Sequence, residues 1–240
     1  MRRLLLFFSL CMCTCIYSVN TPTPTPVTKI LVFGDSLSDT GNVYRFSYHF
    51  KNIIMNLPSI KTEFPTGLIP SPFNLPYYNG RFSDGKNWLE DFANLFHITD
   101  TEDHHDGALE NYAFGGAWAS SYGIDGKKHV LEFPLDLSEQ YLEFKLLHPF
   151  PFIKSNNVLA IIFIGANDYL ATDTSTPINT QVNHVVNSIT DTMKKIHDKS
   201  HISHFLVIGM PDLSQTPYAL HLSTYAKTLL KNLSEEHNSK

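Results

Sequence analysis

From residue 29 onward, short apolar runs alternate with longer stretches of helical periodicity, and this alternation constrains the fold more than any other feature. It is typical of a parallel sheet covered by helices, because parallel strands need long crossover connections. We therefore predict one α/β domain over residues 29–240. The expected strands are 29–34, 110–113, 158–165 and 204–209, and the expected helices are 88–96, 137–147, 180–199 and 217–236.

The first twenty residues differ in character from the rest. Met1-Arg2-Arg3 are followed by an uncharged apolar run that ends near Tyr17. That run is shorter than the ~20 residues a membrane span needs, so residues 1–20 are predicted to be a signal peptide of a secreted or periplasmic protein. An uncleaved N-terminal membrane anchor is the alternative. The Thr-Pro repeat that follows predicts an extended spacer over residues 21–28.

Cysteine content and charge limit the partners of the mature chain. Cys11, Cys13 and Cys15 all lie in the N-terminal segment, so no disulfide is expected after its removal; a lipid-modified cysteine is the alternative. Without residues 1–20, 16 Lys and Arg face 23 Asp and Glu, a net charge of −7 with neutral histidines. Such a chain lacks the broad basic surface that nucleic acid requires. A neutral or zwitterionic small molecule or lipid fits this charge better, and we expect a monomer.

Three predicted strands end in turns of small residues that carry groups of catalytic type. Because the carboxyl ends of parallel strands meet at one edge of a sheet, these groups are expected to lie together. A serine there can act as a nucleophile, while backbone N–H groups at a glycine pair and an asparagine amide can stabilise an oxyanion. Each motif alone is equally typical of a helix cap or a plain turn. The three motifs are Gly34-Asp35-Ser36, Gly115-Gly116 and Gly165-Ala166-Asn167-Asp168.

These segments resemble the GDSL, or SGNH, family of serine esterases and lipases. The resemblance covers roughly residues 29–237, and it implies a flavodoxin-like three-layer sandwich with a parallel sheet between helices. Within the family, the chain looks most like the secreted bacterial lysophospholipases A and glycerophospholipid–cholesterol acyltransferases. The matching blocks are 34–42, 79–85 followed by Trp88, 111–117, 165–168 and 207–217.

The resemblance implies a role for each matched residue. Ser36 would be the nucleophile. The N–H groups of Ser36 and Gly116 and the side-chain amide of Asn167 would form the oxyanion hole, with Gly115 as the alternative to Gly116. Asp35 and Asp168 would support the turns. The reaction implied is hydrolysis or transfer of a carboxylic ester, with a lysophospholipid or another lipid ester as substrate and no metal or organic cofactor.

Residues 56–85 are rich in Pro, Gly, Asn and aromatic residues, which predicts a long surface loop at the rim of the substrate site. Its aromatic side chains could line an acyl groove and make transient contact with a membrane surface, and ordinary loop packing is the alternative. Arg81 and Asp84 are expected to hold this loop rather than to touch substrate. The aromatic residues in question are Phe64, Phe73, Tyr77 and Tyr78.

The general base is not identified by the sequence. The resemblance implies an Asp-x-x-His block beyond a fifth strand, and none is found before Lys240. The Asp-x-x-His at Asp198–His201 precedes a predicted strand, so it is expected at the sheet edge opposite Ser36. His221 could in principle face the site, whereas His104-His105 are expected in a solvated acidic loop, with a metal cluster as the alternative. His148 is expected at the end of a helix.

Three hypotheses follow from the unidentified base. The favoured one is an esterase domain whose C-terminal strand and helix are missing and whose activity is therefore impaired. A working hydrolase with an unusual base and a secreted, non-catalytic protein that binds lipid or glycan are the alternatives. An esterase for acetylated sugars is the competing substrate class.

Overall fold

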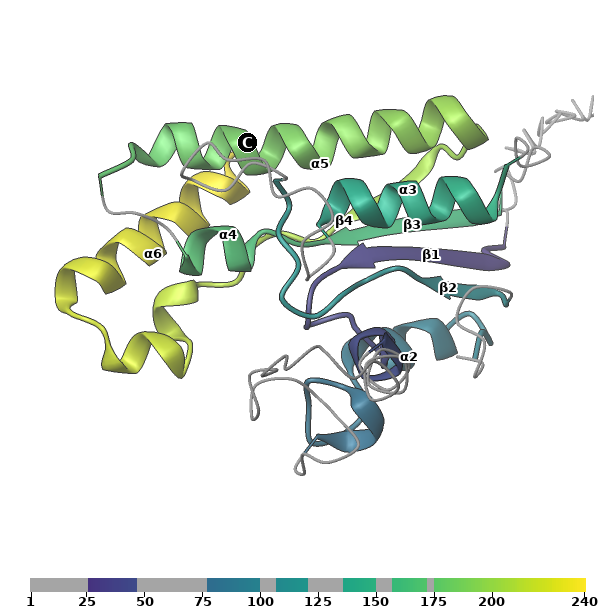
Figure 1. Cartoon of the computed structure of the whole chain (residues 1–240), viewed down its shortest axis with the longest axis horizontal. Coiled ribbons are helices and arrows are strands. Elements are labelled where there is room, and N and C mark those ends of the chain that lie inside the picture. The colour runs from purple at the N-terminus through teal and green to yellow at the C-terminus, as the bar shows by residue number, and fades with distance from the viewer. Residues whose placement is uncertain (1–25, 47–76, 100–106, 121–135, 150–156, 172–174) are drawn as a thin grey trace, which may run out of the picture.

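A computed structural model describes residues 26–46, 77–99, 107–120, 136–149, 157–171 and 175–240. Within them, four strands form one sheet in the order β2-β1-β3-β4, and all neighbouring pairs are parallel (Figure 1). Gly34, the last residue of β1, lies opposite Phe163, the last residue of β3, so these strands end level with each other. The strands are β1 (Lys29–Gly34), β2 (Leu109–Asn111), β3 (Val158–Phe163) and β4 (His204–Val207).

The connections contain the helices. Two begin with reciprocal capping boxes: Asn87 pairs with Glu90 at the start of α2, and Asp136 pairs with Glu139 at the start of α3. Residues 42–46 are also helical. The α-helices are α2 (Trp88–Asn94), α3 (Leu137–Leu147), α4 (Ala166–Leu170), α5 (Ile178–Ser200) and α6 (Thr224–Asn238), and the 3₁₀ turns are η1 (Tyr78–Gly80), η2 (Leu213–Gln215) and η3 (Tyr218–His221).

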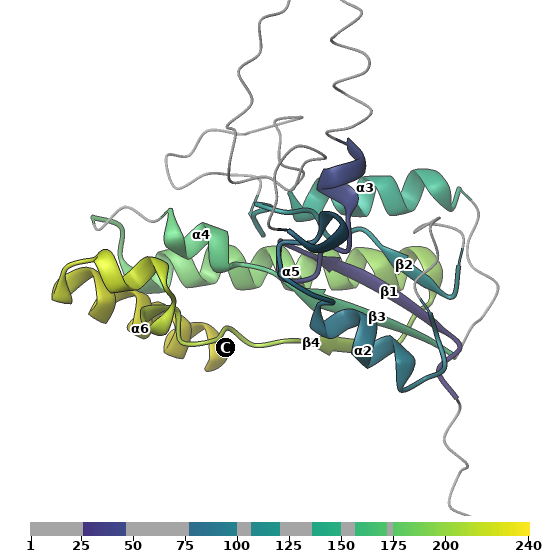
Figure 2. The ribbon, with the colours of Figure 1, turned by 90° about the horizontal axis from the view of Figure 1, so that it is seen from below.

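Helices cover both faces of the sheet. Along β1, Leu31 and Phe33 point into the core shared with α3 and α5, whereas Ile30 and Val32 point into the core shared with α2. Figure 1 shows α5 and α3 on one side of the strands and α2 on the other, and Figure 2 views the same layers from the α2 side. The predicted α/β sandwich with a parallel sheet is confirmed.

Most predicted elements are present, with several differences. The helix predicted over 217–236 is wrong as a single element, because it is divided into η3 and α6. Leu222 is extended, and the Ser223 side chain accepts a hydrogen bond from the N–H of Ala226, which starts a new helix. The short helix α4 was not predicted. Strands β2, β3 and β4 are shorter than expected, whereas β1 and α3 have the predicted bounds.

Several predictions lie outside the described residues. These include the signal peptide with its three cysteines, most of the spacer, the cluster around His104-His105, and Phe64 and Phe73 of the rim loop. No helix in the described part of the chain is long and apolar enough to span a membrane.

Candidate active site

Ser36 lies in a tight turn directly after β1. The backbone oxygen of Asp35 accepts hydrogen bonds from the N–H groups of Ser38 and Asp39, each at 3.0 Å. The Asp35 carboxylate accepts a further bond from the Leu37 N–H at 3.0 Å. Asp35 is buried while Ser36 is half-buried, so the turn is anchored in the protein and the serine remains accessible.

Asp39 joins this turn to the end of β2. One carboxylate oxygen accepts from the N–H groups of Gly41 and Asn42 at 2.7 and 2.6 Å. The other accepts from the N–H groups of Val43 and Gly115 at 3.2 and 2.9 Å. Burial raises the pKa of Asp39, and the four N–H donors oppose that rise. Its position before helical residues could have suggested a cap, but its bond to Gly115 has no local signal in the sequence.

Gly115 and Gly116 form the turn that follows β2. A Cβ at Gly115 would lie 2.0 Å from the ring of Phe82, so only glycine fits there. Gly116 has φ +81°, a conformation that favours glycine. Neither the Ser36 N–H nor the Gly116 N–H donates a hydrogen bond to any residue that the structure describes. Both are therefore available as donors to a ligand.

The turn after β3 contacts the same segment through two neighbouring side chains. The Asn167 amide donates to the backbone oxygen of Ala117 at 2.8 Å. The Asp168 carboxylate accepts from the N–H groups of Ala119 and Ser120 at 2.8 and 3.1 Å and from the Ser120 hydroxyl at 2.8 Å. Asn167 is half-buried and Asp168 is buried. The structure thus places Asn167 beside the residue that follows Gly116.

Like Asp39, the buried carboxyl groups of Asp35 and Asp168 have raised pKa values. Burial raises the pKa of Asp35 to about 7, and the nearby Asp168 carboxylate contributes to that rise. Burial raises the pKa of Asp168 to about 6, opposed by its bonds from Ala119 and Ser120.

Gln140 holds the end of β1 from the opposite side of the turn, and the sequence did not indicate this role. Its side chain, on α3, accepts from the Gly34 N–H at 2.9 Å and donates to the Gly34 oxygen at 2.8 Å. Gly34 and Gln140 are 106 residues apart, so no local motif connects them. The two bonds fix the backbone two residues before Ser36.

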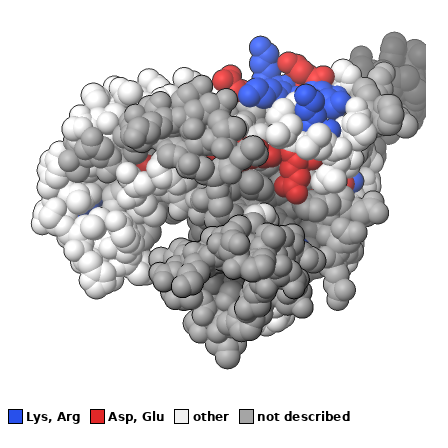
Figure 3. All heavy atoms as spheres, in the orientation of Figure 1, with Lys and Arg blue, Asp and Glu red and all other residues white. Residues whose placement is uncertain are grey.

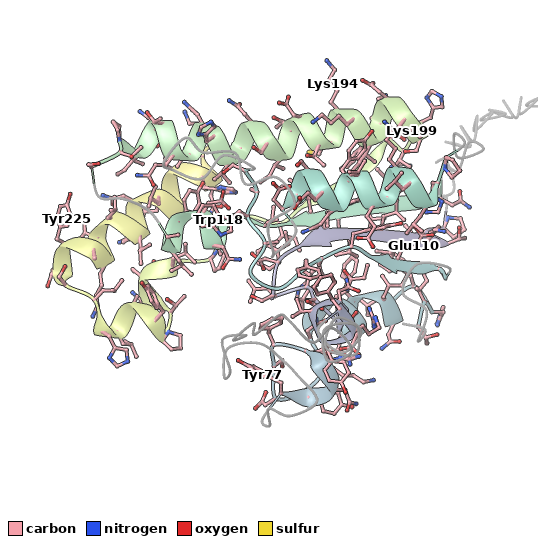
Figure 4. All side chains as sticks on the ribbon, in the orientation of Figure 1. Tyr77, Glu110, Trp118, Lys194, Lys199 and Tyr225 are labelled. Carbon is pink, nitrogen blue, oxygen red and sulfur yellow. The ribbon has the colours of Figure 1, made fainter. Side chains whose placement is uncertain are left out.

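The structural role predicted for Arg81, to hold the rim loop, is confirmed. Its guanidinium donates to both carboxylate oxygens of Glu90 on α2, at 3.0 and 2.7 Å, and to the backbone oxygen of Asn79. This ties the segment around η1 to the rest of the domain. Asp84 is exposed, and its predicted contribution stays a prediction. Tyr77 packs against Phe82, whose ring lies next to Gly115, so part of the aromatic rim is at this turn. Tyr77 is labelled in Figure 4.

No described histidine hydrogen-bonds to Ser36. His201 is the C-cap of α5 and precedes β4, which is the amino end of that strand, as predicted. His221 is exposed in η3. His148 caps α3 and lies 2.8 Å from the buried carboxylate of Glu110, which also accepts from the hydroxyl of Tyr112. Within the residues that can be described, no three His, Cys, Asp or Glu side chains gather as a metal site would require.

Comparison with known proteins agrees with this geometry. Residues 30–240 match the family GDSL-like Lipase/Acylhydrolase. The chain is 29% identical over 218 residues to the phosphatidylcholine-sterol acyltransferase of Aeromonas hydrophila, covering 87% of this chain and 55% of that protein. It is 29% identical over 214 residues to the secreted effector protein SseJ of Salmonella typhimurium, covering 89% of this chain and 41% of that protein. The chain thus spans about half the length of these curated relatives.

Proposed function

The chain belongs to the GDSL-like lipase/acylhydrolase family, whose reactions are ester hydrolysis and acyl transfer, and on this premise we propose that Ser36 is its nucleophile. The observation that carries the proposal is the meeting of three strand ends at one sheet edge. β1 leads to an accessible serine, β2 to a glycine turn with an unpaired N–H, and β3 to an asparagine amide held beside that turn. This arrangement suits attack on a carbonyl carbon, with donors for the oxygen.

The proposed reaction proceeds through an acyl-enzyme. A base takes the proton of the Ser36 hydroxyl as its oxygen bonds to the ester carbon, and the carbonyl π electrons move onto the carbonyl oxygen, where the Ser36 N–H, the Gly116 N–H and the Asn167 amide stabilise them. Collapse of this intermediate restores the carbonyl and breaks the bond to the substrate's alcohol, which leaves with the proton returned by the base. Water or a second alcohol then gives a proton to the base and takes the acyl group, and the proton returns to the Ser36 oxygen. Asp35 and Asp168 hold the turns that carry these groups.

The base that accepts the Ser36 proton is not among the hydrogen-bond partners of Ser36 in the described residues. In a serine hydrolase that lacks its base, the oxyanion hole and substrate binding alone still accelerate the reaction about 10³–10⁴-fold over water. The serine site is still expected to direct whatever turnover is present.

A lipid ester is the proposed substrate class. The rim next to Gly115 presents the aromatic rings of Tyr77 and Phe82, and Leu37 beside the nucleophile is 43% exposed. On the face drawn in Figure 3, lysine and arginine gather over the end of α5 beside acidic side chains, and most of the remaining described surface in this view is uncharged. One relative is named for acyl transfer from phosphatidylcholine to sterol, which supports this class. An acetylated sugar is the competing substrate.

Export is proposed as well. The basic start and the apolar run of residues 1–20 have the composition of a signal peptide, and one relative is named as a secreted effector. Detection of a product that begins near residue 21 after expression in a bacterium would support it, and recovery of the intact N-terminus would contradict it.

The test is hydrolysis of p-nitrophenyl esters with acyl chains of two to sixteen carbons, and of lysophosphatidylcholine, by wild type and Ser36→Ala. Ser188→Ala on α5 is the matched control. We expect turnover that depends on Ser36 and rises with chain length. A preference for the acetyl ester would favour the sugar esterase, whereas binding of lipid without turnover, unchanged in Ser36→Ala, would overturn the enzymatic proposal in favour of a binding protein.

A further inference from the structure

The last turn of α6 reaches back to the end of β3. His237 lies there, and it is the one buried histidine among the residues that the structure describes. Its Nδ1 lies at a hydrogen-bond distance of 2.8 Å from the hydroxyl of Tyr169, and the two rings pack edge to face with centroids 5.7 Å apart. Burial lowers the pKa of His237, which keeps the imidazole neutral and able to accept this bond. Burial of two polar rings is costly unless they pair, so the contact is specific.

Tyr169 lies on α4, a helix that cannot hold its own position. It has five residues, and its N-cap Gly165 provides no side-chain cap, whereas isolated helices of this length are unstable. Its placement therefore depends on contacts with other segments. Three consecutive residues supply them: Asn167 bonds to Ala117, Asp168 to Ala119 and Ser120, and Tyr169 to His237.

The start of α4 packs closely against α5 and α6. Gly165 has φ +123°, and a Cβ there would lie 2.8 Å from Val185 on α5 and 3.8 Å from the His237 ring. The neighbouring Asn238 holds the segment after β4, because its side chain accepts from the Met210 N–H at 2.7 Å and donates to the Met210 oxygen at 2.8 Å. The end of α6 thus braces the segments that follow both β3 and β4.

We propose that His237 is a positioning residue, which fixes α4 through the hydroxyl of Tyr169 and so holds the Asn167 amide in place for the oxyanion. The proposal rests on the function proposed above for Asn167. The physical reason is that Asn167 and Tyr169 are two residues apart on one helical turn. A shift of the tyrosine ring therefore rotates this turn and moves the Asn167 amide. Displacements of about 1 Å at a catalytic group can cost ~10²-fold in rate.

The test measures kcat and KM for p-nitrophenyl butyrate in His237→Ala, His237→Asn, Tyr169→Phe and the double variant His237→Ala/Tyr169→Phe. We expect His237→Ala and Tyr169→Phe each to lower kcat about tenfold with KM within about twofold. The double variant should be no worse than either single one, because both remove the same bond. His237→Asn keeps an acceptor near the position of Nδ1 and should recover most of kcat. An unchanged kcat in Tyr169→Phe, or independent losses in the double variant, would overturn the proposal.

A second readout does not depend on turnover. Amide hydrogen exchange over residues 165–171 should be at least about fivefold faster in Tyr169→Phe than in wild type, with exchange in β1 unchanged. Tyr225→Phe, at an exposed tyrosine on the same helix α6, is the control and should change neither readout. If wild type shows no Ser36-dependent hydrolysis, the proposed function fails, and unchanged exchange in Tyr169→Phe would separately refute the role of His237. Tyr169→Phe removes one oxygen only, so it serves if His237→Ala does not fold.

Discussion

The side-chain amide of Asn167 donates a hydrogen bond to the backbone oxygen of Ala117, 2.8 Å away. Ala117 directly follows Gly116, so this bond couples the turn after β3 to the turn after β2. One of the two amide protons is used, and the nitrogen rather than the oxygen of the amide faces the glycine turn. The second proton remains for a ligand, which is the orientation that an oxyanion donor needs.

The first prediction concerns this amide. Asn167→Ala should lower kcat for a p-nitrophenyl ester by about 10²–10³-fold, because a preorganised donor to the oxyanion is lost. Its effect on KM should be small. Asn183→Ala, at an exposed asparagine on α5, is the control for substitution of the residue type. A kcat within twofold of wild type for Asn167→Ala would exclude Asn167 from the oxyanion site.

A second prediction tests the two hydrogen bonds between the Gln140 side chain and the Gly34 backbone. Gln140→Leu should lower the free energy of unfolding by about 2–4 kcal/mol, because it leaves both the N–H and the oxygen of Gly34 without their side-chain partner in a buried position. Urea unfolding measures the change. Gln215→Leu, at an exposed glutamine in η2, should change it by less than about 0.5 kcal/mol. Equal stabilities of the two variants would show that the bonds to Gly34 contribute nothing.

Third, Gly115 should tolerate no side chain. Gly115→Ala places a Cβ 2.0 Å from the ring of Phe82, so we expect a large loss of stability together with loss of activity. Gly85→Ala is the matched control, since nothing lies within 4 Å of its Cβ position. Adding Phe82→Leu to Gly115→Ala should restore part of the melting temperature. The absence of any recovery would show that the clash with Phe82 is not the cause.

Fourth, Asp35 should make stability depend on pH in a defined direction. Burial raises the pKa of Asp35 to about 7 from an ordinary value of 3.8, so the folded state favours the protonated carboxyl. The resulting stabilisation is fully present below about pH 4 and is lost as the pH rises toward and through 7. Asp35→Asn keeps an uncharged acceptor for the Leu37 N–H at every pH.

The measurement for Asp35 is urea unfolding of both proteins from pH 4 to pH 8. The stability of wild type relative to Asp35→Asn should fall steadily over this window and level off above about pH 7. Taking the difference removes the contributions of titrating groups that do not interact with Asp35, and Asp168 is the neighbour whose charge remains coupled to it. A constant or rising difference would mean that the pKa of Asp35 is not raised in the folded protein.

Local patterns in the sequence were sufficient for most elements of the fold. β1 was predicted to the residue because its apolar run stops at Gly34. The helix α3 also has its predicted bounds, and the structure shows a capping box of Asp136 and Glu139 at its start. The helix predicted over 217–236 was wrong because apolar periodicity continues across Leu222 and Ser223, although the chain is extended at Leu222 and Ser223 caps a new helix. The spacing of apolar residues shows which face of a segment is buried, but it does not show where the helix is interrupted.

Only part of the candidate site could be predicted from local sequence patterns. The motifs at Ser36, Gly116 and Asn167 could be found because each follows an apolar strand, and parallel strands bring their ends together. Asp35 and Asp168, which lie inside the motifs, were indicated by the resemblance, whereas the distant residues that hold these motifs could not be found. Gln140 lies 106 residues from Gly34, and His237 lies 68 residues from Tyr169. Nothing near either residue distinguishes it from other polar residues on a helix.

The sequence by itself thus determined the order of strands and helices, the end of β1, the turns that carry the proposed nucleophile and donors, and the family that the chain resembles. These properties depend on neighbours a few residues apart: capping, turn conformation and alternation of apolar side chains. Only the tertiary structure decided which buried polar groups meet, such as Asp39 with Gly115 and His237 with Tyr169. Those pairings arise when helices pack on the sheet and each buried donor or acceptor must find a partner, and the packing depends on the whole chain at once.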